Sequence, residues 1–347
     1  MPSLQKETVG LDIEPGYVAA VQGTSGRVAV SKAAYASLPA GAVRDGEVMD
    51  VEAVASALRE LFSQHKLPKR VRIGVANQRI AMRMVDLPPI SDAKQIASAV
   101  RFSAQEHIPM PLDQAVLEHQ ILGPVQTPDG ARTRVVVVAA RRDMIDRLLE
   151  AIRRAGLQPQ GIDLSAFAMI RALHRGDGSG TVAYLNVGGV TNLAIATGTT
   201  CVFTRVVGAG TEWIAGELAE RRGLTVEHAE AWLVHVGLET PVQDIDGDSE
   251  IVTEAREVLS AGARRIAEEV RNSLDFQAMR EGSDAAESAV LTGPAVAIPG
   301  FGQEVGGALG LPFEIGVVAE ARAGGFGGIE PGKLAVAAGL TVEEIKA

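Results

Sequence analysis

The sequence predicts an α/β protein of about two domains, because one arrangement of strands occurs twice along it. A strand–turn–strand–turn–strand pattern fills residues 8–39 and returns at 181–210. The tripeptides Leu11-Asp12-Ile13 and Leu185-Asn186-Val187 match at an offset of 174 positions. Helical patterns and further strands follow each meander, which is typical of α/β folds. The length of 347 residues also fits two domains at roughly 100–200 residues each.

The first meander opens with a buried strand at 8–14, which the turn Pro15-Gly16 closes. After the third strand, Asp50 is placed to cap a helix whose apolar residues recur at helical spacing. Pro68 ends that helix.

The segment 69–163 then alternates strands and helices, which predicts a small α+β module. Within this module we interpret the polar stretch 123–131 as a linker between two strands. The linker 175–180 follows the module and is the expected domain boundary.

The second meander leads into a helical region expected at about 212–281. An acidic stretch at 244–250 interrupts it. This stretch has Gly247 fourth where a calcium-binding loop needs glycine sixth, so we interpret it as a solvated acidic loop. Residues 288–316 return to a strand–turn–helix–strand pattern.

The composition excludes several functional classes. The net charge of −10 and the pI near 5.2 argue against a nucleic-acid-binding protein, which needs a basic surface. The single cysteine, Cys201, lies in an alternating strand pattern and is interpreted as a buried thiol. No transmembrane stretch, signal peptide or basic membrane-surface helix is recognisable. A cytoplasmic protein without a direct membrane anchor is therefore expected.

The order of these segments resembles a known family. Two meanders half a chain apart, followed by a strand that ends in Thr292-Gly293, are similar to the actin/Hsp70-type nucleotide-binding fold. The inserted module resembles that of FtsA and of the type IV pilus assembly protein PilM. Three stretches look like PilM in particular: VDLPPISDAKQIASAVRFSAQEHIPMP, VVVVAARRDMIDRLLEAIRRAGLQPQGIDLSAFAMIRAL, and RRGLTVEHAEAWL followed by EEVRNSLDFQ.

The resemblance implies a two-lobed, actin-like α/β fold with an inserted α+β module of the SHS2 type. Its expected parts are a first lobe at 1–69 plus 157–178, the inserted module at 70–156, a second lobe at 179–215 plus 286–347, and a helical subdomain at 216–285.

In this family the first turns of both meanders hold nucleotide phosphates. The resemblance therefore implies that Asp12 holds Mg²⁺ weakly, through water, and that Gly16 and Tyr17 adjoin the phosphates. Glu14 and Pro15 replace the small residues usual there. Pro15 removes an N–H donor, and Glu14 brings a negative charge toward a negative ligand. Alanine at position 19 stands where the family has a lysine.

The other nucleotide contacts that the resemblance implies come from the second turn, the late glycine turn and the helical lobe: Asn186, Gly188, Gly189, Thr191, Gly210, Glu217, Gly293 and Pro294. Asn186 replaces an aspartate, so it offers a metal only a neutral ligand. Two interpretations stay open, namely weak binding of ATP with Mg²⁺ and turns that only build the fold. Hydrolysis is not expected, and no catalytic residue is assigned.

The function implied by the resemblance is a scaffold in type IV pilus assembly or related secretion machinery. Its partner would be the cytoplasmic N-terminal tail of a PilN-like inner-membrane protein, bound in a groove between the inserted module and the first lobe. Met82, Met84 and Leu87 are the candidate contacts, and module core is the alternative interpretation of the same residues.

Further expected partners are other components of the pilus platform and a second copy of the chain. Two other functions stay open: an active ATPase coupled to assembly, and an FtsA-like filament.

Overall fold

The computed structural model describes residues 8–23, 28–90, 92–128, 130–175, 180–280, 283–318 and 325–342. Its internal contacts divide the chain into two compact units. We call Met1–Ala76 with Ala151–Ala347 the core unit, and Asn77–Glu150 the inserted unit. Most of the expected boundary linker, at 176–179, lies outside the described residues.

The core unit contains two five-stranded sheets with the same topology. In each sheet three antiparallel strands form a meander, and the first strand of the meander also pairs in parallel with a later strand. The strand orders are β3-β2-β1-β6-β10 and β13-β12-β11-β14-β15. The first sheet comprises β1 (Val9–Glu14), β2 (Tyr17–Gly23), β3 (Val30–Ser37), β6 (Arg70–Val75) and β10 (Gln158–Leu164). The second comprises β11 (Thr181–Val187), β12 (Thr191–Thr197), β13 (Thr200–Val207), β14 (Ser288–Thr292) and β15 (Phe313–Ile315).

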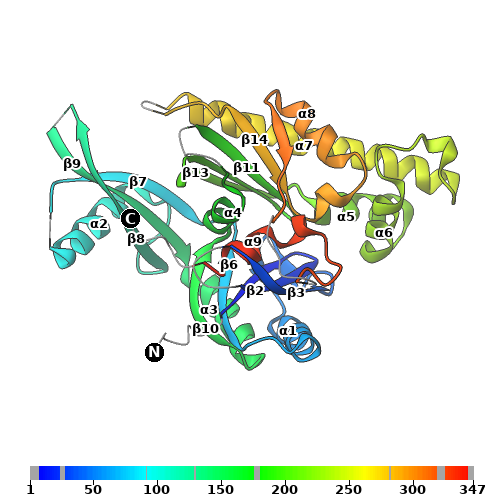
Figure 1. Ribbon diagram of the computed structural model, residues 1–347, viewed down its shortest axis with the longest axis horizontal. Coiled ribbons are helices and arrows are strands. Elements are labelled where there is room, and N and C mark those ends of the chain that lie inside the picture. Colours follow the sequence, from blue (N-terminus) through cyan, green and yellow to red (C-terminus); the bar gives the residue numbers. More distant parts are fainter. Residues whose placement is uncertain are drawn as a thin grey trace. The chain divides into compact units, whose positions relative to one another are not determined.

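Two helices lie between the sheets (Figure 1). Helix α4 (Ser165–Leu173) packs against the meander of the second sheet, and α9 (Ala335–Gly339) packs against β1 and β2. The two helices touch through their backbones, because a Cβ added at Gly339 would lie 1.8 Å from the carbonyl oxygen of Ala168. Glycine at this position therefore lets the helices approach so closely.

The remaining helices cover the outer faces. Asp50 caps α1 as expected, since its side chain accepts hydrogen bonds from the backbone N–H groups of Glu52 and Ala53. The apolar core of the second sheet continues into the helices that follow it, for example from Leu193 to Ile266. The helices on the outer faces are α1 (Val51–His65), which precedes the second sheet, and α5 (Thr211–Arg222), α6 (Val226–Val236), α7 (Ser249–Ala278) and α8 (Phe301–Leu309). Short elements complete the unit: β4 (Val43–Arg44), β5 (Glu47–Val48), η1 (Val242–Asp244), η2 (Pro294–Ala297) and η3 (Pro331–Leu334).

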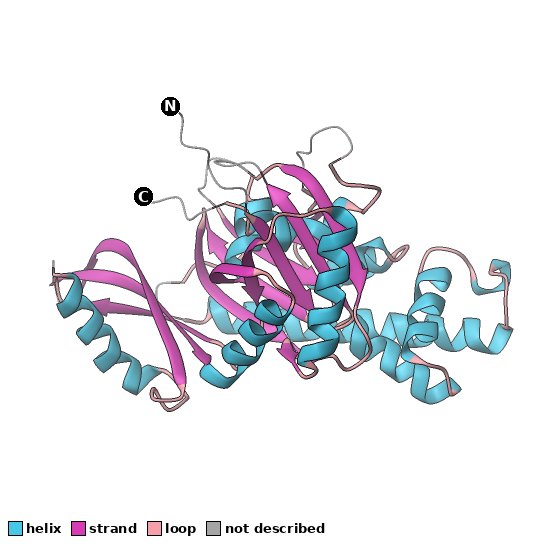
Figure 2. Ribbon diagram, turned by 90° about the horizontal axis from the view of Figure 1, so that it is seen from below, coloured by secondary structure: helices cyan, strands magenta, loops and turns pink. Residues whose placement is uncertain are grey.

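The inserted unit is a three-stranded antiparallel sheet with helix α2 along one face (Figure 2). Its strands are β7 (Ala81–Leu87), β8 (Ala115–Thr127) and β9 (Gly130–Arg141), and its helices are α2 (Ala93–His107) and the start of α3 (Arg142–Arg154). The expected linker at 123–131 is wrong. Beyond a bulge at Leu122, both strands continue as a paired hairpin, where exposed polar side chains need no burial.

The expected module boundary at residue 70 also differs from the structure. Strand β6 pairs with β1 and β10 in the first sheet, and the inserted unit begins only at Asn77. The alternation of Val71 and Ile73 with arginines marks a strand but does not say which sheet it joins.

Candidate functional site

Two hairpin turns, one from each sheet, form the centre of the candidate site. The first turn holds Pro15 and Gly16 between β1 and β2. Gly16 has a φ of +85°, which suits the second central position of a type II turn, and proline suits the first. The second turn, Gly188–Val190, joins β11 to β12, and the N–H of Gly188 donates to the carbonyl oxygen of Val190 at 3.0 Å.

These two turns are in direct contact. A Cβ added at Gly188 would lie 2.4 Å from Oε2 of Glu14. At Gly189 an added Cβ would lie 2.3 Å from the carbonyl oxygen of Pro15. Gly189 is thus restricted to glycine by the backbone of the opposite turn, whereas a Cβ at Gly188 would displace the Glu14 carboxyl.

Other residues expected from the sequence adjoin the second turn. Gly293, at a φ of +100°, lies so close that its Cβ would meet Oδ1 of Asn186 at 2.7 Å. Gly210 starts α5, and its Cβ would lie 2.3 Å from the carbonyl oxygen of Gly189. The hydroxyl of Thr191 donates to the carbonyl oxygen of Ala209 at 2.7 Å. Two backbone segments, Ala209–Gly210 and Gly293, therefore hold the second turn and its flanking strand ends in place.

The last two expected residues have other surroundings. Glu217 lies on α5, where its carboxylate accepts a hydrogen bond from Arg221 at 3.3 Å. Arg221 also binds Glu254 of α7 at 2.8 Å, so the Glu217 carboxylate belongs to an ion-pair cluster between two helices. Pro294 opens η2 directly after Gly293.

The first turn brings two carboxyl groups into the interior. Asp12 and Glu14 are each only 2% exposed. Burial raises the pKa of Asp12 to about 7, and burial together with the neighbouring Asp12 raises the pKa of Glu14 well above its ordinary value. Hydrogen bonding from Tyr17 lowers both pKa values but does not offset burial. The two carboxyls are therefore not both ionised at neutral pH.

The residue paired with Asp12 across the hairpin is Ala19, which is fully buried. Directly paired residues of antiparallel strands present their side chains on the same face. A cation at position 19 would lie beside Asp12 and lower the pKa of that carboxyl. Because position 19 is alanine, no cation there offsets the cost of burying the Asp12 carboxylate.

Next to the second turn, sequence reasoning missed the buried polar residue Asn192. It pairs with Asn186 across the second hairpin, so the two amides share a face. Asn186 donates from Nδ2 to Oε1 of Glu14 at 3.1 Å. Both amide atoms of Asn192, and Oε2 of Glu14, are buried without a hydrogen-bond partner. The hairpin register could have identified Asn192, because a three-residue turn sets positions 186 and 192 opposite each other.

The geometry of the turns tests whether a nucleotide fits. The turns touch at Gly188 and Gly189, where even an added Cβ would meet Glu14 or Pro15, so a phosphate could enter between these two glycines and the first turn only if that contact opened. Over the described ranges, no three His, Cys, Asp or Glu side chains come together as metal ligands. Asp12 as a Mg²⁺ ligand therefore stays a prediction.

The three candidate partner contacts on β7 divide between the two faces of the inserted sheet. Leu87 is buried in the cluster that β7 and β9 form with α2. Met82 and Met84 lie on the face opposite α2, paired with Val138 and Val136 of β9. Strand β7 is at the edge of its sheet.

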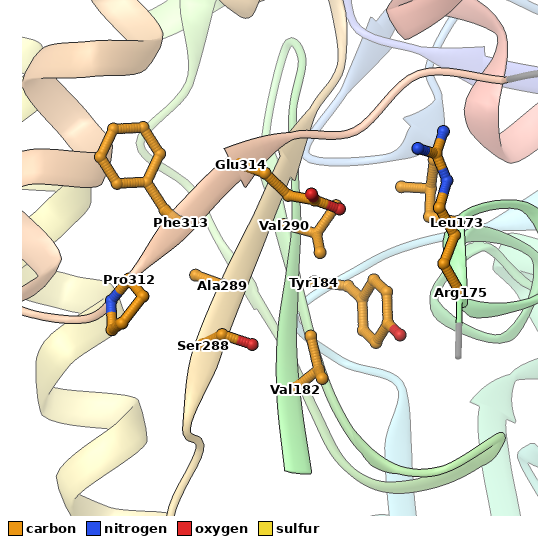
Figure 3. Close-up of a pocket in the computed structure, with 10 residues that line it drawn as sticks. All are labelled: Leu173, Arg175, Val182, Tyr184, Ser288, Ala289, Val290, Pro312, Phe313 and Glu314. Atoms are coloured by element: carbon orange, nitrogen blue, oxygen red, sulfur yellow. The ribbon is translucent and has the colours of Figure 1, made fainter. Parts of the chain in front are cut away.

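A separate cavity of about 330 Å³ lies beside the second sheet (Figure 3). Burial and Glu314 raise the pKa of Tyr184 to about 12, and the Tyr184 hydroxyl lies 3.2 Å from Nδ1 of His174. No sequence motif pointed to this cavity. Its lining comes from α4, the residues after it, β11, β14 and β15: Leu173, Arg175, Val182, Tyr184, Ser288, Ala289, Val290, Pro312, Phe313 and Glu314.

Solved structures of known proteins share the fold of this chain. A solved structure described as a PilM–PilN type IV pilus biogenesis complex is 25% identical, with a TM-score of 0.80 over 96% of this chain and 97% of that one. MreB5 of Spiroplasma citri bound to ADP shares the fold at 14% identity and a TM-score of 0.54, covering 96% and 95% of the two chains.

A curated relative, the cell division protein FtsA of Streptococcus pneumoniae, is 24% identical over 319 residues, which are 79% of this chain and 69% of that protein. The expected actin-like fold is thereby confirmed. The family model for the type IV pilus assembly protein PilM matches residues 10–320. The chain therefore belongs to the PilM family of type IV pilus assembly proteins.

Proposed function

We propose that this protein is a scaffold of type IV pilus assembly that binds the N-terminal tail of a PilN-like inner-membrane protein. The observation that carries the proposal is the likeness, over nearly the whole of both chains, to a chain of a PilM–PilN type IV pilus biogenesis complex. The family match over residues 10–320 supports it independently.

The inserted unit offers a suitable docking strand. Among the described residues, β7 pairs with β9 alone, so its other edge carries backbone groups that no strand pairs with. An extended tail can add to such an edge through main-chain hydrogen bonds, and flexible methionines beside it adapt to the tail's side chains. The proposed contacts are Met84, which is half-buried, and Met82, which is buried and would become accessible only as the tail docks. Leu87 holds the strand on α2 and positions it.

The tail would also place the protein at the membrane. Across the part of the chain that the structure describes, no helix has both the length and the apolarity to cross a bilayer. We therefore propose peripheral attachment to the inner membrane through the partner. Other platform components and a second copy of the chain remain predicted partners.

A substitution on β7 tests the docking strand. Met84→Glu puts a charge on a half-buried position, so the protein should bind the PilN-like tail peptide at least tenfold more weakly in fluorescence anisotropy. Met279→Glu is the matched control, because Met279 is 85% exposed on the core unit. Equal tail affinity of wild type and Met84→Glu would refute the strand. No tail binding by the wild type would refute the function.

The proposal includes weak or absent nucleotide binding. Alanine at position 19 and asparagine at position 186 each remove a charged contact that the family uses. At about 1.5–3 kcal/mol each, the loss weakens binding by roughly two to four powers of ten. Isothermal titration with ATP–Mg²⁺ should detect little heat. Steady ATP turnover that Asp12→Ala abolishes would instead make the protein an ATPase.

A further inference from the structure

The carboxyl group of Glu14 lies inside the second turn, although Glu14 belongs to the first sheet. Its Oε2 atom touches Gly188, and its Oε1 atom accepts a hydrogen bond from Nδ2 of Asn186 at 3.1 Å. The backbone N–H groups of Gly189 and Val190 also act on this carboxyl, since they lower its pKa. The side chain is 2% exposed. A residue of one lobe is thus enclosed by the turn of the other.

The side chain of lobe two that hydrogen-bonds this carboxyl is a donor, the amide of Asn186. The turn beside this amide lies against the same carboxyl at Gly188, and its next two residues, Gly189 and Val190, carry successive backbone N–H groups, an arrangement that suits an anion. Such a set suits a phosphate as well as a carboxylate. Solved structures of the same fold include MreB5 bound to ADP and to AMPPNP.

We propose that Glu14 is the resident occupant of an anion site formed by Asn186, Gly189 and Val190. The site takes the phosphate of a nucleotide only when this carboxyl is removed. Pro15 reinforces the closure, because its carbonyl oxygen lies against Gly189 and it has no N–H to offer a phosphate. The Glu14 carboxyl of the first lobe therefore links it to the second lobe, in the place that a bound phosphate would take. This inference does not depend on binding of a PilN-like tail.

The occupancy explanation makes a specific prediction about two variants at one position. Glu14→Ala removes the carboxyl and frees the three donors. Glu14→Gln keeps the volume, so the space stays filled even though the charge is gone. Loss of charge repulsion alone would make both variants bind ATP, whereas occupancy predicts binding only by Glu14→Ala.

The test is isothermal titration of wild type, Glu14→Ala and Glu14→Gln with ATP–Mg²⁺. The exposed Glu304→Ala serves as the control. Glu14→Ala should bind at least tenfold more tightly than wild type, and Glu14→Gln should stay within about twofold of it. Equal affinity of wild type and Glu14→Ala, including no binding by either, would overturn the proposal. So would tighter binding by Glu14→Gln.

Hydrogen exchange of the wild type gives a second readout that needs no variant to fold. The amides of Gly189 and Val190 should already be protected, and ATP–Mg²⁺ should add no protection. Fast exchange of these amides, or their protection by ATP, would overturn the inference. Tail binding measured on the same wild-type sample keeps this outcome separate from that of the proposed scaffold function.

Discussion

Neutralising the buried carboxyl pair should change how the stability of the core unit depends on pH. Burial raises the pKa of Asp12 from 3.8 to about 7. Between these values the folded state holds a proton that the unfolded state has released. The stabilisation from that proton is complete below about pH 4, and it is lost as the pH rises through about 7. The core unit should therefore become less stable between pH 5 and pH 8.

The expected size follows from the pKa shift. About two of the three pKa units lie between pH 5 and pH 7, so Asp12 alone should lower the free energy of unfolding by about 2–3 kcal/mol over this window. Glu14 acts in the same direction, because burial and Asp12 raise its pKa too. The double variant Asp12→Asn with Glu14→Gln lacks both titrating groups and should lose this part of the pH dependence.

Tryptophan fluorescence is a suitable probe of urea unfolding. Both tryptophans of the chain, Trp213 and Trp232, belong to the core unit, so the signal follows that unit alone. The measured quantity is the change in unfolding free energy from pH 5 to pH 8, compared between wild type and the double variant. A control with Asp284→Asn and Glu304→Gln removes two exposed carboxyls of the same unit. Identical pH dependence in wild type and the Asp12/Glu14 variant would refute the reasoning.

Three further predictions concern packing. Gly339→Ala should destabilise the core unit by about 1–3 kcal/mol in urea unfolding, because its Cβ meets the Ala168 carbonyl, whereas Gly216→Ala, which meets nothing, should not. Cys201 should stay unreactive toward Ellman's reagent at pH 8 until the protein unfolds, since burial raises its thiol pKa to about 12; rapid native labelling would contradict this. Arg256→Met should cost about 2–3 kcal/mol, because Arg256 donates to the backbone carbonyl oxygen of Val236 at the end of α6 and to that of Leu238 in the following loop, each at 3.3 Å. The exposed Arg264→Met is its control in the same unfolding assay.

The repeated meander could be predicted because its signals are local. Alternating apolar residues and a turn glycine lie within a few positions of each other at Leu11–Gly16 and again at Leu185–Gly188. The sheet to which Arg70–Val75 belongs could not be predicted in the same way. Its partners, β1 and β10, lie far away along the chain, and the apolar pattern of a buried strand does not indicate which strands it pairs with.

In the candidate site, too, features set by neighbouring residues could be predicted, whereas contacts between distant residues could not. Turn glycines such as Gly188 and Gly189 are visible in the sequence. Glu14 was interpreted there only as a charge that repels a phosphate. In the structure it accepts a hydrogen bond from Asn186, which lies 172 positions later. Whether a carboxyl repels a ligand or replaces it depends on donors that only the folded chain brings to it.

The packing of α9 on β1 has a consequence for the order in which the units can form during synthesis. The inserted unit is one continuous segment, Asn77–Glu150, so its contacts are complete soon after it leaves the ribosome. Strand β1 must wait for α9, more than 300 residues later. At 5–20 residues per second this delay is roughly 15 to 60 seconds. During that time the apolar face that α9 will cover remains open to chaperones and to other nascent chains.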